Sequence, residues 1–431
     1  MNKTRRIVSP LAWVPSLYFA MGLPFVVLNM VSAVMFKDLG IQDAQIAFWT
    51  SLIMWPWTIK FLWSPFLELF RTKKFFVVAT QLLSGVMFGL GALALHLPSF
   101  FAVTIAVFAV VAFSGATHDI AADGVYMSEL STRDQAKYIG WQGAFYNLAK
   151  LVATGGLVWF AGWLYERSSA EGVASFDAYV HAWTVVLAIL CVLLVVMGLY
   201  HVKMLPSGGA AAEKHTLREG LQGLREVIVA FFAKKHIWYY IAFIILYRLG
   251  EGFVMKIVPL FLKADTAVGG LGLSNQQIGL YYGTFGAGAF LLGSLLAGYY
   301  IAARGLRRTL FTLCCIFNIP FVVYALLAFF QPASMWFVGG GIVLEYFGYG
   351  FGFVGLTLFM MQQVAPGKHQ MAHYAFASGI MNLSVMLTGA VSGYLSDWLG
   401  YRIFFLVVML ATIPAFVMTR LIPFTYPDEK K

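Results

Sequence analysis

The sequence predicts an all-α membrane protein with twelve transmembrane helices in two pseudo-symmetric six-helix bundles. The membrane class follows from composition, because 60% of the 431 residues are hydrophobic and only 11% are charged. Soluble domains have roughly 45–50% and about 25%. The bundle arrangement follows from a repeated pattern in the two halves. Because a water-exposed surface needs far more charge, the composition disfavours a soluble enzyme.

Each predicted span is a run of about 20 mostly apolar residues, the length that crosses a bilayer. The first run is too long, and too rich in Pro and aromatic residues, for a signal peptide. We therefore expect it to be a mature helix. The twelve spans are predicted at residues 12–36, 44–69, 74–96, 99–127, 136–163, 179–203, 237–262, 275–302, 307–331, 334–363, 369–396 and 401–423.

Lys and Arg concentrate in alternate loops, and cytoplasmic loops are the ones that carry this excess. With the N-terminus inside, the opposite side holds only Lys37, Arg167, Lys263 and Arg402. We therefore expect both termini to be cytoplasmic. Topology then accounts for the net charge of +10, so the charge does not indicate a nucleic-acid partner.

One long internal loop divides the predicted spans six and six. We expect an N-terminal bundle at 1–203, a cytoplasmic linker at 204–236 and a C-terminal bundle at 237–431. The linker carries an apolar stripe at helical spacing, which predicts an amphipathic helix along the inner membrane surface. A calmodulin-like target is the alternative. The stripe consists of Leu217, Leu221, Leu224, Ile228 and Phe231.

The two halves also resemble each other in sequence. Residues 39–46, before the second span, match 271–278, before the eighth. Part of this match could reflect convergent helix capping. A second match at nearly the same offset pairs Asn147-Leu148 and Trp163-Leu164 with Asn382-Leu383 and Trp398-Leu399. Two such matches indicate a six-plus-six parallel duplication, the plan of transporters with a midplane site.

Ionisable residues inside the spans are expensive and usually face a cavity or a partner. Spans 3, 6, 9 and 12 have none in their interiors, as expected if every third helix faces lipid. The interior charges balance four to four. They are Lys60, Asp119, Asp123, Lys150, Arg248, Glu251, Lys256 and Glu345.

The four acidic residues are the candidates for proton coupling. Asp119 and Asp123 lie one helical turn apart, and two carboxylates so close in a low dielectric cannot both ionise cheaply. Asp119 is the better candidate because Asp123 lies nearer the inner end. Glu345 has no basic residue in its own span. Glu251 could instead form a structural pair with Arg248, three residues earlier.

The substrate-binding candidates are Lys60, Lys150, Arg248, Lys256 and Tyr346. The two lysines could bind an anionic group or neutralise the aspartates, and we expect neutralisation to be the role of Lys150. Aromatic residues flanking Glu345 could form a wall for a sugar ring. His118 could relay protons, although hydrogen bonding is the commoner role. Glycines in spans 8 and 10 predict close helix packing, or bending during transport.

Several motifs resemble the major facilitator superfamily over the whole length, and within it the branch of AmpG-type muropeptide permeases and acetyl-CoA transporters. Lys60 to Pro65 resembles the branch's segment ending span 2. The Ala116 to Gly124 segment resembles its span 4, with His118 replacing the usual Gln, and Tyr247 to Glu251 resembles its Tyr-Lys-Leu-Gly-Asp. Two further segments resemble the superfamily's cytoplasmic gate motif, with a degenerate copy in the first half. The gate residues implied are Glu68, Arg71, Gly298, Arg304, Arg308, Asp397 and Arg402.

This resemblance implies the major facilitator fold and secondary transport, with proton-driven uptake of a polar, muropeptide-like solute across a bacterial inner membrane. A siderophore or acyl-CoA-like anion is the alternative substrate. A membrane-bound transferase is the alternative class, although no phosphate loop or His-Glu-x-x-His motif occurs. We expect a monomer in the lipid bilayer with no enzymatic activity, cofactor, metal or nucleic-acid partner.

Overall fold

The structure, a computed structural model, describes residues 8–41, 43–69, 71–209, 217–273 and 275–427. Within these ranges, nine helical segments are long and apolar enough to cross a membrane. The all-α membrane class is therefore confirmed. Three predicted spans, 44–69, 237–262 and 369–396, are not separate members of this set, and the count of twelve stays a prediction.

The chain divides into two compact units. Unit 1 contains residues 1–129 and 145–224, and unit 2 contains 130–144 and 225–431. One long helix, α8 (Thr132–Leu151), contributes its first part to unit 2 and its last part to unit 1. The bundle boundaries expected from the sequence remain a prediction.

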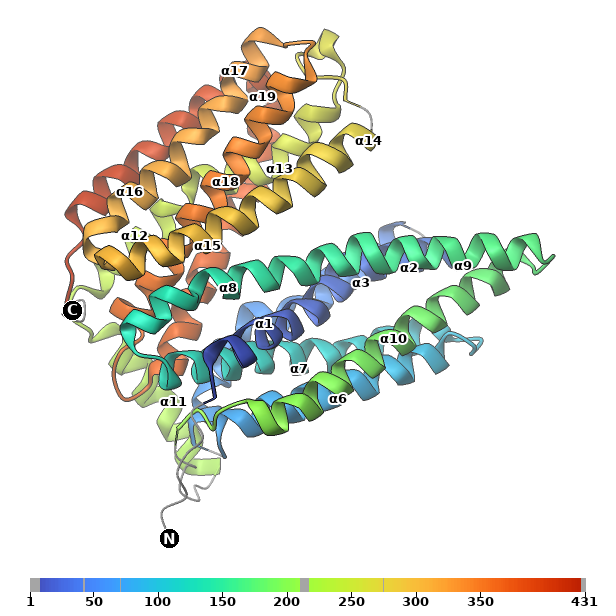
Figure 1. Cartoon of the computed structure of the whole chain (residues 1–431), viewed down its shortest axis with the longest axis horizontal. Helices are drawn as coiled ribbons and strands as arrows, with labels where there is room; N and C mark the ends of the chain where they lie inside the picture. The colour runs from blue at the N-terminus through green and yellow to red at the C-terminus, as the bar shows by residue number, and fades with distance from the viewer. Residues whose placement is uncertain (1–7, 42, 70, 210–216, 274, 428–431) are drawn as a thin grey trace. The chain divides into compact units, whose positions relative to one another are not determined.

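Unit 1 is built from helices that run side by side (Figure 1). Besides the end of α8, they are α1 (Pro10–Val26), η1 (Val27–Val31), α2 (Ser32–Asp38), α3 (Asp43–Ile53), α4 (Trp55–Ile59), η2 (Lys60–Leu62), α5 (Ser64–Leu69), α6 (Lys73–Ala94), α7 (Phe100–Glu129), η3 (Val152–Leu157), α9 (Val158–Ala170) and α10 (Ser175–Met204).

Proline accompanies two irregular stretches of unit 1, the end of α1 and the region from α4 to α5. In α1, Pro15 and Pro24 lie inside the helix, and the chain widens into the π-helix η1 after Pro24. Membrane helices accommodate Pro through such local adjustments. The predicted span 44–69 is broken into short helices, with Pro56 and Pro65 in the first turns of α4 and α5. Pro favours a first helical turn because its missing N–H has no intrahelical acceptor there.

The core of unit 1 forms where α6 packs against α7 and α10. Phe88 of α6, Phe108 of α7 and Trp183 of α10 are almost completely buried. The Phe88 and Phe108 rings meet edge to face with centroids 5.9 Å apart. This packing fixes α7, the helix that carries both predicted aspartates.

Unit 2 contains the remaining helices. They are α11 (Leu217–Phe232, whose first residues group with unit 1), α12 (Ile237–Tyr247), α13 (Leu249–Lys263), η4 (Thr266–Val268), α14 (Asn275–Ile278), η5 (Gly279–Phe285), α15 (Gly286–Arg304), α16 (Leu306–Asn318), η6 (Ile319–Phe321), α17 (Val322–Phe330), α18 (Met335–Phe359), η7 (Met360–Val364) and α19 (Gln370–Leu421).

Glycine allows α15 and α18 to approach closely. A Cβ atom on Gly293 would collide with the carbonyl oxygen of Phe347, and one on Gly350 with that of Phe290. Small residues allow membrane helices to pack at this range. This contact explains Gly293 of span 8 and Gly350 of span 10 by close packing, whereas Gly283 and Gly288 have open space around them.

Two breaks shape the rest of unit 2. Arg248 leaves helical geometry (φ −102°, ψ 8°) and separates α12 from α13. Gly400 bends α19 with a φ of 69°, a left-handed conformation that glycine adopts without steric cost. The predicted spans 369–396 and 401–423 are the two arms of this bent helix.

The linker is tied to both units. In unit 1, Glu129 Oε1 accepts hydrogen bonds from the backbone N–H groups of Gly208 and Gly209, at 2.7 and 3.3 Å. In unit 2, Lys234 Nζ donates to the carbonyl oxygens that follow α18, those of Val364, Ala365 and Pro366. A carboxylate at the end of α7 therefore binds the start of the linker, and an ammonium group near the end of the linker binds the residues at the end of η7.

The described part of α11 packs against the start of α19. Phe231 is fully buried and stacks on Phe376 with ring centroids 5.1 Å apart, while His373 Nε2 donates to the Val227 carbonyl at 3.2 Å. The side chains of Leu217 and Leu221 lie outside the described ones. The C-terminal end of the predicted apolar stripe therefore contacts protein, and the membrane-surface position stays a prediction.

Candidate functional site

The carboxylates of α7 form the centre of a buried polar site in unit 1. Asp119 and Asp123 are 8% and 6% exposed. Lys60 Nζ lies 3.5 Å from Asp119 Oδ2, and the Tyr18 hydroxyl donates to Asp123 Oδ1 at 2.8 Å. The 3₁₀ turn η2 brings Lys60 beside α7. The structure thus brings three of the predicted residues together.

Lys60, and not Lys150, is the lysine that lies beside Asp119. In the part of the chain that the structure describes, Asp119 pairs with Lys60 from the second predicted span. Lys150 lies on α8 with an exposed side chain and takes part in none of the described ion pairs. Adjacency of spans in the sequence therefore did not determine which lysine approaches the carboxylate.

One side of the site has unsatisfied polar atoms. Among the described residues, Asp119 Oδ1 and Trp57 Nε1 are buried without a hydrogen-bond partner. The Trp57 indole lies beside the Asp119 carboxylate. Such orphaned groups are rare in protein interiors, because each loses its contact with water.

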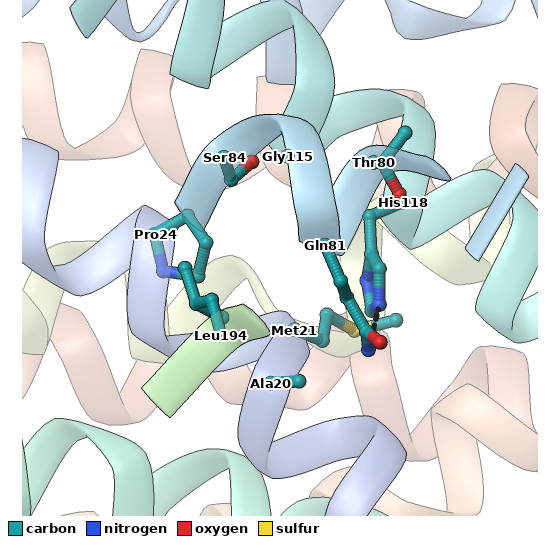
Figure 2. Close-up of a pocket in the computed structure, with 9 residues that line it drawn as sticks. All are labelled: Ala20, Met21, Pro24, Thr80, Gln81, Ser84, Gly115, His118 and Leu194. Carbon is teal, nitrogen blue, oxygen red and sulfur yellow. Dashed lines mark hydrogen bonds between the residues drawn. The ribbon is translucent and has the colours of Figure 1, made fainter. Parts of the chain in front are cut away.

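His118 faces away from this site, into a hydrogen-bonded chain. Gln81 Nε2 donates to His118 Nε2 at 2.9 Å, and His201 Nδ1 donates to Gln81 Oε1 at 2.8 Å. His201 Nε2 in turn shares a hydrogen bond with Ser16 Oγ, 2.9 Å away. Figure 2 shows His118 and Gln81 at a small pocket that Thr80, Ser84 and Leu194 also line.

This chain joins α7, α6, α10 and α1. The amide of Gln81 separates the two imidazoles, and an amide does not titrate as a histidine does. The arrangement favours hydrogen bonding as the role of His118, rather than proton relay.

In unit 2, Arg248 and Glu251 form a closed ion pair on one helix. Arg248 Nε and Nη2 donate to the two carboxylate oxygens of Glu251, both at 2.5 Å. The Arg248 guanidinium also lies 5.1 Å from the centroid of the Phe353 ring. The pair is buried. This arrangement agrees with the alternative that Arg248 and Glu251 form a structural ion pair within their helix.

Glu345 occupies an aromatic environment on α18. It is 5% exposed, and its Oε2 accepts a hydrogen bond from the Tyr324 hydroxyl at 2.8 Å. The neighbouring Tyr346 packs edge to face on Tyr282, with ring centroids 4.9 Å apart. Lys256 lies on α13, but its side chain is outside the described ones.

The residues implied in the gate occupy different places. Gly298 lies against the first part of α8, where a Cβ would be 3.0 Å from the Ala136 carbonyl oxygen. Arg304 stacks over the Tyr300 ring, and Arg308 is exposed. In unit 1, Arg71 has a left-handed φ of 63°, and the Glu68 side chain lies outside the described ones.

Asp397 and Arg402 cannot share a gate with Arg304 and Arg308, and this part of the gate expectation is wrong. Arg402 Nε donates to the Ala328 carbonyl at 3.1 Å, near the end of α17. Arg304 and Arg308 flank the start of α16, and α16, η6 and α17 run the length of the unit between them. The two motif copies therefore lie at opposite ends of unit 2.

Four neutral partners of buried polar side chains were not among the predicted residues. Tyr18, Tyr324, Gln81 and His201 each bond to a buried polar side chain. Buried polar groups need such partners, so Tyr, Gln and His inside apolar spans were a usable signal.

Comparison with known proteins identifies the family. The profile described as Major Facilitator Superfamily matches residues 16–362 and, in a second alignment, 244–431. The chain is 23% identical over 408 residues to the anhydromuropeptide permease of Escherichia coli (strain K12). The aligned region covers 93% of this chain and 77% of that protein.

Solved structures share the fold. The Major Facilitator Superfamily transporter FucP, in the outward conformation, matches with a TM-score of 0.70 and 13% identity, over 96% of this chain and 98% of that chain. A bacterial homologue of the iron transporter ferroportin matches with a TM-score of 0.64 and 15% identity, over 95% and 98%. With its two units of membrane-spanning helices and their buried charges, the chain belongs to the Major Facilitator Superfamily and is a multi-pass membrane transporter.

Proposed function

We propose that this transporter couples proton entry to the uptake of a polar, muropeptide-like solute by alternating access. The observation that carries the coupling is the state of Asp119, which is buried, paired through one oxygen to Lys60 and unpaired at the other among the described residues. When such a carboxylate gains a proton, the only interaction that it loses is the weak ion pair with Lys60. The substrate class rests on the similarity to the anhydromuropeptide permease.

Each carboxylate has a distinct place in this mechanism. Asp119 takes up the proton and releases Lys60, and Asp123, held by Tyr18, stabilises the ammonium group when Asp119 is neutral. Glu345 and Tyr346 are the solute-binding residues that we assign in unit 2. Arg248 and Glu251 hold the α12–α13 junction in every state.

The engagement of Lys60 and Arg248 with carboxylates argues against an acyl-CoA-like polyanion, which needs unpaired cations. The orientation and the protein's setting belong to the same proposal. We infer a monomer in a bacterial inner membrane with cytoplasmic termini, in which bundles 1–203 and 237–431 move about the linker 204–236.

Uptake into proteoliposomes of the purified protein tests this function. With an inward proton gradient, we expect labelled anhydromuropeptide to accumulate above its external concentration, and nigericin to abolish the accumulation by collapsing the pH gradient. Accumulation that survives nigericin would contradict proton coupling. Transport of no anhydromuropeptide, alongside transport of a siderophore, would contradict the substrate class.

A further inference from the structure

Two arginines of unit 2 stack on aromatic rings where α16 begins and α19 ends. The Arg420 guanidinium lies 4.2 Å from the centroid of the Phe311 ring. The Arg307 guanidinium lies 5.9 Å from the centroid of the Phe424 ring, just after α19. Phe311 follows Arg307 by one helical turn, so these two side chains are neighbours on one face of α16. The end of α19 packs on α16, and the two stacks together form one surface.

Both arginines lie at the ends of helical segments that are long and apolar enough to cross a membrane. Arg307 is the second residue of the segment Leu306–Phe330, and Arg420 is the last but one of Val391–Leu421. Both side chains are exposed. Because the ends of spanning helices lie at the level of the lipid headgroups, we place this surface at the membrane interface.

The Phe424 ring is held in place by the rest of unit 2. Gln363 Oε1 of η7 accepts hydrogen bonds from the backbone N–H groups of Thr425 and Tyr426, at 2.9 and 3.1 Å. Phe424 also meets the Phe359 ring edge to face, with centroids 5.7 Å apart. Because folding has already fixed this segment, the arginine that stacks on the ring is oriented before a ligand binds.

Two other stacked arginines of the protein have carboxylate partners. Arg248 is stacked on a ring and binds Glu251. Arg167 is stacked too, and its Nε lies 3.6 Å from Glu171 Oε1. Arg420 takes part in none of the ion pairs among the described residues. A guanidinium group that stacks through its face keeps its N–H edge available, and this edge binds phosphate through two parallel hydrogen bonds.

The surroundings of the two stacks are basic and apolar. The segment from α15 to α17 contains no Asp or Glu, whereas Arg304 and Arg308 flank the start of α16. On α19, exposed apolar residues continue on the same face as Arg420, because Val417 and Ile413 precede it by three and seven residues. They are 50% and 51% exposed. A molecule that fits this surface combines a negative charge with an apolar chain.

We propose that Arg420, with Phe311 and Arg307, forms a binding site for the headgroup of an anionic phospholipid. The guanidinium edge of Arg420 donates to the phosphate oxygens, and the acyl chain lies along the face of α19 that Val417 and Ile413 form. This apolar face distinguishes a lipid from a free phosphate ion, because the ion has no chain to contact it. Basic surfaces beside spanning helices are known to bind anionic headgroups.

Native mass spectrometry of the purified full chain tests the site, with short-chain phosphatidylglycerol and phosphatidylcholine as the probes. We expect the wild type to bind phosphatidylglycerol more tightly, and Arg420→Gln to weaken that binding roughly fivefold, the contribution of one arginine beside an anionic lipid. Phe311→Leu keeps every charge and should also weaken it, because it removes the ring that orients the guanidinium group. Arg167→Gln is the matched control, since it removes an exposed, stacked arginine from another helix, and its affinity should equal that of the wild type.

Equal affinities of Arg420→Gln and the wild type for phosphatidylglycerol would overturn the site. An equal loss of affinity in Arg167→Gln would overturn it too, because any surface arginine would then attract the lipid. Inorganic phosphate is the third probe, and we expect it not to displace phosphatidylglycerol at equal concentration. Displacement would assign the surface to a soluble anion and contradict the lipid site. These measurements need no transported solute, so their outcome is independent of the proposed function.

Discussion

The two units hold their buried charges in opposite ways. In unit 1 the ion pair joins two elements, η2 and α7, through a single contact of 3.5 Å between Lys60 and Asp119. In unit 2 the pair of Arg248 and Glu251 lies at the start of one helix and is closed by two hydrogen bonds. Charge-assisted bonds are normally 2.7–2.9 Å long, so the first pair is loose and the second tight.

We infer from this difference that the ion pair of unit 1 can break during transport, whereas the ion pair of unit 2 stays formed. A loose contact between elements costs little to break, and its carboxylate retains an unused oxygen. A two-point pair within a helix leaves an uncompensated buried charge when one partner is lost. Both units also hold one carboxylate with a tyrosine hydroxyl at 2.8 Å, so the units share that feature and differ in the ion pair.

The largest effect on stability is expected in unit 2. Glu251→Gln leaves the Arg248 guanidinium buried without its counter-charge, at a cost of about 3–5 kcal/mol. We expect a large loss of folded protein in thermal unfolding followed by size-exclusion chromatography. Arg248→Met combined with Glu251→Met removes both charges and should recover most of that loss. Glu251→Gln with the stability of the wild type would contradict a structural role for this pair.

The tyrosine hydroxyls allow the units to be compared by the same substitution. Tyr18→Phe and Tyr324→Phe each remove one hydrogen bond to a carboxylate, worth roughly 1.5–3 kcal/mol. We expect Tyr18→Phe to lower the rate of gradient-driven uptake several-fold at constant KM. Tyr324→Phe should raise KM and leave the maximal rate unchanged, because Glu345 contacts the solute in this account. Initial rates over a range of solute concentrations distinguish the two, and the reverse assignment would exchange the roles of the units.

The smallest effect is expected at the linker ties, outside the membrane-spanning segments. Burial lowers the pKa of Lys234 from 10.5 to about 8, so the folded protein loses the lysine proton before the unfolded chain does. The free energy of unfolding should therefore rise as the pH increases from about 8 to 10.5, and fall again as the pH returns through 8. Lys234→Met should remove this dependence, whereas Glu129→Gln at the other tie should retain it. Chemical denaturation at a series of pH values measures the effect.

Much of the fold was predictable because apolar runs, loop charges and repeated segments are local in the sequence. The match of 39–46 with 271–278 places Asp43 and Asn275 at helix starts, and both α3 and α14 begin there. The partners within the site were not predictable, because they depend on rotation of helices about their axes. Only packing brings Lys60 rather than Lys150 to Asp119, or turns His118 toward Gln81. Arg402 was predicted at the wrong end of unit 2, because a match to a motif depends on residue types and does not show at which end of the bundle the segment lies.

The central claim is that the loose pair of unit 1 carries the coupling, and Asp119→Asn tests it most directly, with Glu345→Gln as its counterpart in unit 2. Proteoliposomes are assayed for gradient-driven accumulation and for exchange of labelled against unlabelled anhydromuropeptide without a gradient. We predict that Asp119→Asn loses accumulation and retains part of the exchange, whereas Glu345→Gln changes the affinity and still accumulates. Normal accumulation by Asp119→Asn would contradict the account.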